Sequence, residues 1–401
     1  MATSRMTDNS LPNVGIIGTP DQITTIIPIL TSQGFCVKAI WTQYPAVTKK
    51  LAERFSVPHI PPTFKSLLLL HDVDLVYVAT EPRLQAEVTV KALTSGKHCV
   101  SMEPRSVAEV EKMLSLARYY SQLDSIMETH MRFIPTFTKL KELVNSKHIG
   151  KIFTIDVRLS MGSLIGSEHY SWKCDPSLGG GALNLVGSHF IDLIRFLCPL
   201  GENLIKQVNC LLHTFVCSTH CIHGYRTIES DDYVSLQMKL SKSVIASVLI
   251  NCNCGSVYDL EILVNGKEGR AIVRDFDLYW MGSGLSEEKL IFKERDSLSD
   301  ETSSLDVNPK LRRSVTSGYN GLFAAIKKHY AEGKTDPSLA SFDDAHHLRS
   351  VLDSARQSHK LSQWVNIPNT SGGASSETTN PFWTKKTELK SDSEKTSIAY
   401  V

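Results

Sequence analysis

The stretch VDLVYVATEPRLQAEVTVKALTSGKHCVSMEP, residues 73–104, gives the clearest indication of the fold. It holds an apolar strand at Leu75–Ala79, a loop, an amphipathic helix and a second strand at His98–Ser101. Both strands are nearly continuous apolar runs, which is typical of strands buried on both faces. A strand, a helix and a further strand joined by short links favour a parallel pair with a right-handed crossover.

The segments before this stretch continue the same alternation. Short apolar strands at Val14–Ile17 and Phe35–Ile40 flank Gln22–Gln33, which carries Ile and Leu at helical spacing, and Ala46–Phe55 has the pattern of a second helix. From about residue 13 to 128 we therefore expect a Rossmann-type, doubly wound parallel sheet. Ligands of such sheets bind at the carboxyl ends of the strands.

The pattern changes after about Thr129. Residues 129–367 are expected to form an α/β domain with an open, mainly antiparallel sheet, in which the Ser-, Glu-, Asp- and Lys-rich residues 283–317 form a mobile insertion. Residues 1–12 are expected to be flexible, and residues 368–401, which hold few aliphatic side chains, to be a disordered tail. The predicted strands are Phe153–Leu159, Lys206–Phe215, Tyr233–Leu240, Ser243–Asn251, Leu260–Val264 and Arg270–Val273, and the predicted helices are Phe133–Lys147, Tyr319–Tyr330 and Phe342–His359.

The bulk composition excludes several classes of protein. The 401 residues include 43 Lys and Arg and 42 Asp and Glu, with no basic stripe that has interleaved aromatic residues, so nucleic acid is not expected as a partner. No apolar run approaches the ~18 residues that span a bilayer, and the first residues lack the apolar region of a secretory signal. We therefore expect a cytoplasmic protein without a membrane partner.

The cysteines point the same way. Nine cysteines, an odd number, lie mostly in apolar surroundings, which favours reduced, buried thiols in a cytosolic protein. Cys217, Cys221, Cys252 and Cys254 could form a quartet, but their spacings are not those of zinc ligands. No metal site is predicted.

The first strand-to-helix turn bears on cofactor binding. A dinucleotide fold needs Gly-x-Gly-x-x-Gly there, so that the backbone can approach a pyrophosphate at the helix N-terminus. Here Gly18 is present, but Pro20 and Ile23 occupy the second and third glycine positions. Thr19 and Gln22 instead predict a capping box around Pro20 as first helical residue. Two interpretations stay open, a well-capped helix without a phosphate site and a tolerant cofactor site.

The ends of the next strands supply the other candidate cofactor contacts. The second strand ends in Trp41-Thr42, where NAD-preferring folds place an acid for the ribose hydroxyls. Trp41 could stack on an adenine or cover the sheet edge. Thr80 follows the third strand, and Gln85 lies in the helix after it. The predicted cofactor-binding residues are Gly18, Thr19, Pro20, Trp41, Thr42, Thr80 and Pro104.

The end of the quoted stretch carries a family motif. Gly96-Lys97-His98 and Pro104 resemble the fourth-strand motif of the glucose–fructose oxidoreductase and inositol dehydrogenase family, which is Gly-Lys-His-Val, two residues, then Glu-Lys-Pro. The resemblance implies NAD or NADP as cofactor and a sugar-like or polyol-like ligand. The family's lysine contacts both nicotinamide and the substrate hydroxyl. In this chain Met102 stands at the Glu position and Glu103 at the Lys position, so the local charge is reversed.

A second constellation follows the glycines Gly179-Gly180-Gly181. The family has an Asp and a His four residues apart on one helical face, with His as general base. Here His189 is present and Leu185 takes the Asp position. The resemblance makes His189 and Glu103 the candidate catalytic residues, and His189 is either a working base or a relic. Asp192 is expected to face elsewhere and to be structural.

Further matches narrow the resemblance to one branch, the glucose–fructose oxidoreductase domain-containing proteins. They include Tyr170-Ser171-Trp172, Gly224-Tyr225-Arg226, Phe342-Asp343-Asp344 and Trp364-Val365-Asn366-Ile367, and extend from about Asn13 to Ile367. The resemblance implies a homodimer formed through the C-terminal sheet. Some members of the branch are secreted and linked to extracellular matrix, which, with the sequon Asn369-Thr370-Ser371, keeps an extracellular location as an alternative.

Two functional hypotheses follow for a chain whose cofactor turn and catalytic positions depart from the family. The first is a pseudoenzyme or binding protein that binds NAD or NADP weakly or not at all. The alternative is an active NAD(P)-dependent oxidoreductase that acts on a sugar or polyol-like substrate. A further alternative is a secreted, matrix-associated protein.

Overall fold

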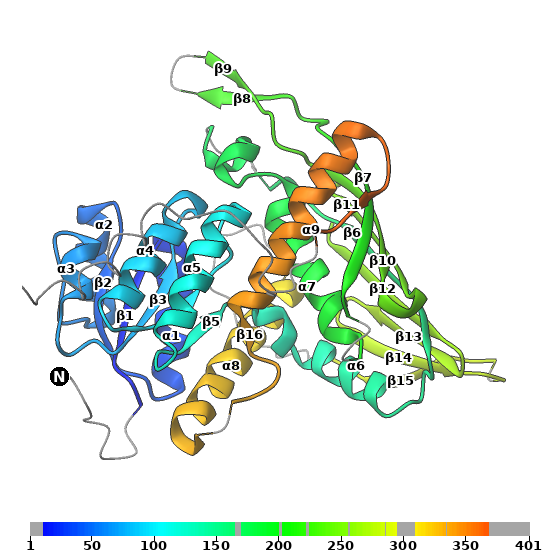
Figure 1. Ribbon diagram of the computed structural model, residues 1–401, viewed down its shortest axis with the longest axis horizontal. Coiled ribbons are helices and arrows are strands. Elements are labelled where there is room, and N and C mark those ends of the chain that lie inside the picture. Colours follow the sequence, from blue (N-terminus) through cyan, green and yellow to red (C-terminus); the bar gives the residue numbers. More distant parts are fainter. Residues whose placement is uncertain are drawn as a thin grey trace, which may run out of the picture. The chain divides into compact units, whose positions relative to one another are not determined.

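The computed structural model of the chain describes residues 11–164, 170–199, 203–221, 224–255, 257–284, 286–294, 309–333 and 335–368. These residues belong to one compact unit that ends at Pro368. A parallel sheet with helices on both faces occupies the first third of the chain, and a large second sheet with helices on one face follows (Figure 1). No helix among the described residues is both long and apolar enough to cross a bilayer.

The first sheet has the predicted Rossmann-type order. Its strands lie in the order β16-β5-β4-β3-β1-β2, and β1 to β5 are parallel. The apolar runs that predicted β3 and β4 are buried. The strands are β1 (Val14–Gly18), β2 (Val37–Trp41), β3 (Leu75–Ala79), β4 (His98–Ser101) and β5 (Ser125–Met127), with β16 (Ala340–Ser341) antiparallel at the edge.

Proline begins several helices of this domain, because its fixed φ suits the first helical residue and it has no N–H to leave unpaired. Pro20, Pro45 and Pro82 hold this position in α1, α2 and α4. The predicted capping box of α1 is wrong. Thr19 is the N-cap residue, but its side chain accepts no hydrogen bond from the helix. The helices are α1 (Pro20–Ser32), α2 (Pro45–Phe55), α3 (Phe64–Leu68), α4 (Pro82–Thr94) and α5 (Val107–Tyr119).

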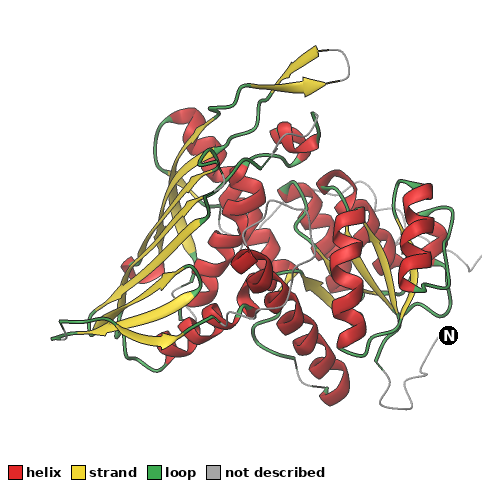
Figure 2. Cartoon of the chain, turned by 180° about the vertical axis from the view of Figure 1, so that it is seen from behind, coloured by secondary structure: helices red, strands yellow, loops and turns green. Residues whose placement is uncertain are grey.

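The second sheet is mainly antiparallel, as predicted. Its order is β15-β14-β13-β12-β6-β11-β10-β7-β17, and β6 and β11 form its parallel pair. In the described part of the chain the helices lie on one face, and no helix covers the other, which we call the uncovered face (Figure 2). The strands are β6 (Ile152–Ser160), β7 (Ile205–His213), β10 (Tyr233–Leu240), β11 (Ile245–Asn251), β12 (Asp259–Gly266), β13 (Gly269–Arg274), β14 (Asp277–Gly282), β15 (Lys289–Phe292) and β17 (Val365–Asn366), and a separate hairpin pairs β8 (Ser218–Cys221) with β9 (Gly224–Thr227).

Late segments of the chain return to the first domain. The long helix α8 (Pro309–Glu332) packs against α1, and its Phe323 contacts Phe35 and Tyr77 in the core of the first domain. Regular structure occupies both ends of the expected insertion 283–317, because β15 and the start of α8 lie there; residues 295–308 lie outside the described residues. The predicted tail and its sequon, from residue 369 on, also lie outside them. The remaining helices are α6 (Pro135–Asn145), α7 (Ser188–Leu197) and α9 (Phe342–Leu361).

Candidate ligand and cofactor site

Several predicted cofactor residues meet at the carboxyl ends of the parallel strands. Gly18, Thr19, Trp41 and Thr80 line a small cavity of about 10 Å³, together with residues of the loop after β3. A side chain at position 18 would place its Cβ 3.0 Å from the carbonyl oxygen of Ala79. A side chain at position 18 would therefore crowd the backbone of β3, whether or not a phosphate approaches it.

A hydrogen bond joins the loops that follow β2 and β3, the two strands that flank β1 in the sheet. The side-chain amide of Gln43, just after β2, donates to the carboxylate of Glu81 at 3.0 Å. This region is where dinucleotide folds hold the ribose. The Trp41 ring meets Phe64 edge to face, with centroids 5.7 Å apart, so it covers the sheet edge. Gln43 and Trp41 thus make contacts within the protein in the region where a dinucleotide would be placed.

Two other predicted cofactor residues are engaged in local structure. Thr42 is buried, and its hydroxyl lies 2.8 Å from that of Thr48. Thr80 donates to the side-chain oxygen of Gln85 through its backbone N–H at 3.1 Å and its hydroxyl at 2.9 Å. The Gln85 amide in turn donates to the carbonyl of Val78 at 2.6 Å and to the Ser101 hydroxyl at 3.1 Å, which ties β3 to β4.

Glu103 lies directly after β4 and faces a buried arginine. Its side chain is 16% exposed, and Oε1 lies 3.8 Å from Nη1 of Arg349 on α9. Burial raises the pKa of Glu103 to about 7, although the Arg349 charge acts in the opposite direction. Arg349 also donates to Asn184 at 3.3 Å and to Asp353 at 2.8 Å. Pro104, beside Glu103, is buried.

His189 follows a turn that is wider than an α-helix. Leu183–Gly187 forms a π-helical turn, and α7 begins at Ser188. The backbone N–H of Leu183 donates to the Asp231 carboxylate at 2.7 Å, which anchors the start of the turn. The π turn changes the angle between Leu185 and His189 from that of the regular α-helical i, i+4 spacing predicted from the sequence. Both residues still line one cavity of about 200 Å³.

A second histidine meets His189 in this cavity. The His130 and His189 ring centroids are 5.3 Å apart, and His130 stacks on Tyr319 with centroids 4.4 Å apart. Nδ1 of His130 lies 2.8 Å from the buried carboxylate of Glu128. Burial and the neighbouring His130 lower the pKa of His189 to about 4, so its ring is neutral at neutral pH. Glu103 is not among the residues that line this cavity.

Sequence reasoning missed Glu128, His130 and Arg349. A signal for the first two was present, because they directly follow β5 at the carboxyl edge of the parallel sheet, where ligands bind. Arg349 carried no such signal. It lies on α9, more than 240 positions along the chain from Glu103, and only the packing of α9 brings the two charges together.

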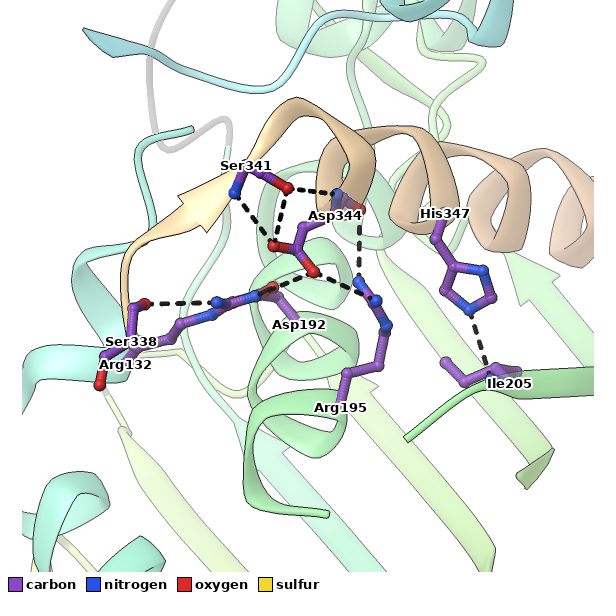
Figure 3. A network of polar contacts seen from close by, with 8 residues as sticks. All are labelled: Arg132, Asp192, Arg195, Ile205, Ser338, Ser341, Asp344 and His347. Carbon is purple, nitrogen blue, oxygen red and sulfur yellow. Dashed lines mark hydrogen bonds and ion pairs between the residues drawn. The ribbon is translucent and has the colours of Figure 1, made fainter. Parts of the chain in front are cut away.

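Asp192 faces away from the cavity, as expected, and belongs to a buried ionic network (Figure 3). Its two carboxylate oxygens accept from Nε and Nη2 of Arg132 at 2.8 and 2.5 Å. Asp344, which caps α9 in a capping box with Ser341, accepts from Arg195 on α7 at 3.2 Å. The network thus joins α7, which carries His189, to η1 (His130–Phe133) and to α9.

Other side-chain clusters do not suggest a metal. Within the described residues, no group of three or more His, Cys, Asp and Glu side chains is arranged to hold an ion. A larger open cavity of about 710 Å³ lies beside β7 and α9, where Arg356 lies 3.6 Å from Asp231. Its lining mixes acidic and basic groups and includes neither His189 nor Glu103.

Comparison with known proteins agrees with the fold. The model of an oxidoreductase family with an NAD-binding Rossmann fold matches residues 12–126, and that of a GFO/IDH/MocA C-terminal domain matches residues 137–272. The chain belongs to the GFO/IDH/MocA oxidoreductase family. Glucose-fructose oxidoreductase domain-containing protein 1 of Xenopus tropicalis is 34% identical over 370 residues, which are 89% of this chain and 93% of that relative.

Solved structures show the GFO/IDH/MocA fold in proteins of different kinds. Levoglucosan dehydrogenase in complex with NADH and L-sorbose is 19% identical, covers 89% of this chain and 99% of its own, and has a TM-score of 0.74. A super-repressor mutant of Gal80p from Saccharomyces cerevisiae is 16% identical, covers 89% and 98%, and has a TM-score of 0.73. At these identities the likeness shows the fold alone.

Proposed function

We propose that this chain is a ligand-binding pseudoenzyme of the GFO/IDH/MocA family, which binds nicotinamide nucleotides weakly and does not oxidise sugars or polyols. The observation that carries the proposal is Glu103. At the position of the family's lysine it presents a carboxylate, and this carboxylate faces Arg349 rather than the cavity that holds His189. The fold is shared with a dehydrogenase and with Gal80p, so ancestry alone does not decide between the two functions.

The electrostatics of Glu103 oppose sugar oxidation. Hydride removal from a carbinol needs a base and a positive charge that stabilises the developing alkoxide, while a bound nicotinamide would accept the hydride. Where the family's lysine would stabilise an alkoxide, Glu103 is either neutral or negatively charged near pH 7 and offers no positive charge.

The base is weakened as well. With a pKa of about 4, His189 holds a proton poorly at neutral pH. The family's Asp position holds Leu185, which lines the cavity and cannot assist the imidazole.

A specific feature favours the alternative, an active NAD(P)-dependent oxidoreductase, because Glu128 orients His130 beside His189 as a carboxylate orients a catalytic histidine.

Two features support weak nucleotide binding, the first strand-to-helix turn and the hydrogen bond between the loops after β2 and β3. Pro20 lacks an N–H, Asp21 adds negative charge near a phosphate, and the Gln43–Glu81 hydrogen bond occupies the ribose region. We expect dissociation constants for NAD(H) and NADP(H) in the tens of micromolar or higher, which correspond to less than about 7 kcal/mol.

Calorimetry with NADH and NADPH tests this proposal. Pro20→Gly should tighten binding, whereas the matched control Pro45→Gly, at the same position of α2, should not. Wild-type protein should show no turnover of glucose or myo-inositol, and Glu103→Lys with Leu185→Asp should gain turnover only together with Pro20→Gly. Nanomolar affinity, cofactor copurified at full occupancy, or rapid native turnover that Glu103→Gln abolishes would contradict the pseudoenzyme.

The uncovered sheet face and the thiols support two further parts of the proposal. We propose a homodimer formed through that face, where Leu211 and Ile245 are 55% and 51% exposed.

We also propose a cytoplasmic rather than extracellular location. Burial raises the pKa of Cys99, Cys210 and Cys252 to about 12, so these thiols stay protonated and inert, as suits core cysteines of a reducing compartment.

A further inference from the structure

The cavity beside His189 has a largely apolar lining. Of the described side chains that line its volume of about 200 Å³, only those of His130, His189 and Tyr258 carry a nitrogen or oxygen atom. The others come from η1 and the residue after it, from α7 and the turn before it, from strands and loops of the second sheet and from α8, and they include Leu185, Leu260 and Phe276. The Tyr258 ring stacks on Phe276 with centroids 6.2 Å apart and extends the apolar surface.

We propose that this cavity binds a small apolar or aromatic molecule that carries a single hydroxyl or carbonyl group, and that this group hydrogen-bonds to His189. The assignment rests on the proposed function only in treating the cavity as a ligand site. It names a chemical class of ligand that differs from the sugar-like or polyol-like ligand implied by the family resemblance.

The size of the cavity sets the size of the ligand. An engineered apolar cavity of about 150 Å³ stays dry and binds benzene. A cavity of about 200 Å³ therefore has room for a benzene ring with one short polar substituent, or for an aliphatic chain of similar volume. The apolar walls favour such a molecule, because each square ångström of apolar surface removed from water contributes to binding.

The polarity of the lining disfavours sugars. A hexose or inositol carries at least five hydroxyl groups, and each one that is buried without a partner weakens binding by roughly tenfold or more. His130 is already committed, since its Nδ1 lies 2.8 Å from Glu128 and its ring is stacked on Tyr319. Two histidines and one phenol cannot pair with the full hydroxyl set of a sugar, whereas a single hydroxyl is readily satisfied.

His189 is the group that can satisfy it. Among the described residues its ring nitrogens have no hydrogen-bond partner, and its contact with His130 is through the rings. A neutral imidazole offers one donor and one acceptor, so it can pair with either a carbonyl or a hydroxyl. His189 and Leu185 line the same cavity. When the polar group of a ligand binds to His189, the apolar part of that ligand therefore lies against aliphatic side chains.

Binding to the intact protein without nucleotide tests the assignment, with benzyl alcohol, toluene and glucose as probes in ligand-observed NMR and calorimetry. We expect benzyl alcohol to bind, toluene to bind about tenfold more weakly, and glucose to show no competition. His189→Phe should remove the preference for benzyl alcohol over toluene while toluene still binds. This loss of preference is a readout that a merely structural role of His189 would not produce.

Variants that fill the cavity provide a second test of the ligand assignment. Val315→Trp on α8 should abolish binding of both aromatic probes, and the matched change Val47→Trp, at an exposed position of α2, should not. Leu311→Trp, also from α8, serves the same purpose if circular dichroism shows that Val315→Trp does not fold. Glucose binding that either tryptophan variant blocks, or no binding of benzyl alcohol to the wild type, would overturn the assignment.

The outcomes separate this assignment from the proposed function. Oxidation of benzyl alcohol with NAD⁺ would end the pseudoenzyme proposal and would support the ligand class. Weak nucleotide binding together with preferred glucose binding in the cavity would leave the pseudoenzyme in place and would overturn the ligand class.

Discussion

Oε1 of Glu103 lies 3.8 Å from Nη1 of Arg349, and within the described part of the chain this buried oxygen accepts no hydrogen bond. The distance is too long for a hydrogen bond but short enough for the two charges to interact. Because Asn184 and Asp353 also engage the guanidinium, Arg349 is held in place while Glu103 is only partly satisfied. This arrangement makes the stability of the fold sensitive to the protonation of Glu103.

Glu103→Gln should change how stability depends on pH. The folded-state pKa of about 7 is higher than the ordinary value of 4.5, so the folded protein holds this proton more tightly than the unfolded chain. The contribution of protonated Glu103 to the free energy of unfolding is fully present below pH 4.5, declines as the pH rises, and is lost above about pH 7. In total it amounts to about 3 kcal/mol. Urea unfolding at pH 5 and pH 8 should show this decline in wild type and not in Glu103→Gln. Parallel profiles of stability against pH for the two proteins would contradict the expectation. Glu53→Gln, at an exposed position, serves as the control.

The His189 ring should titrate far below ordinary histidines. Its folded pKa of about 4 is lower than 6.5, so its contribution to stability is present above pH 6.5 and is lost as the pH falls toward 4. The ring signal in NMR, assigned by its absence in His189→Gln, should not shift between pH 7.5 and 5.5. His130→Phe removes one cause of the lowered pKa and should move the midpoint upward. A His189 midpoint near 6.5 in wild type would show that the ring is solvated.

Removal of Asp192 should be strongly destabilising. Arg132 and Asp192 are 6% and 4% exposed, and Asp192→Asn would leave the buried guanidinium with only the more distant carboxylate of Asp344, 3.9 Å away, as a charged partner. Such losses cost about 3–5 kcal/mol in the free energy of unfolding. The matched change Asp343→Asn breaks an ion pair with Arg118 whose side chains are 65% and 59% exposed, and should cost at most about 1 kcal/mol. Equal, small losses in urea unfolding would mean that the network in Figure 3 does not hold α7 in place.

The uncovered face of the second sheet should mediate dimerisation. Leu211 on β7 and Ile245 on β11 alternate with buried neighbours, so both point outward from the helix-covered side. Leu211→Asp with Ile245→Asp should give monomers in light scattering at micromolar concentration, because charges at the core of an interface are strongly unfavourable. Leu69→Asp, at a position that is 73% exposed in the first domain, should leave the dimer intact. A wild type that is monomeric at this concentration would rule out the interface.

Local sequence by itself determined the elements of the first domain. The predicted strands Leu75–Ala79 and His98–Ser101 coincide with β3 and β4, because a strand buried on both faces needs a continuous apolar run that is visible in the sequence alone. The order of strands and helices was likewise enough for the parallel sheet and for the mainly antiparallel second sheet. The residues at the carboxyl edge, Gly18 and Trp41 among them, were located because the edge follows from this order.

The tertiary structure alone decided the chemistry at that edge. The pairing of Glu103 with Arg349, the position of His130 beside His189 and the π turn before α7 each depend on contacts between distant segments. The local periodicity of the sequence does not predict such contacts, because the burial of a side chain and the charges near it depend on which distant segments pack against it. For the same reason Glu103, at the position of the family's lysine, faces a buried arginine, whereas His189 lines an apolar cavity.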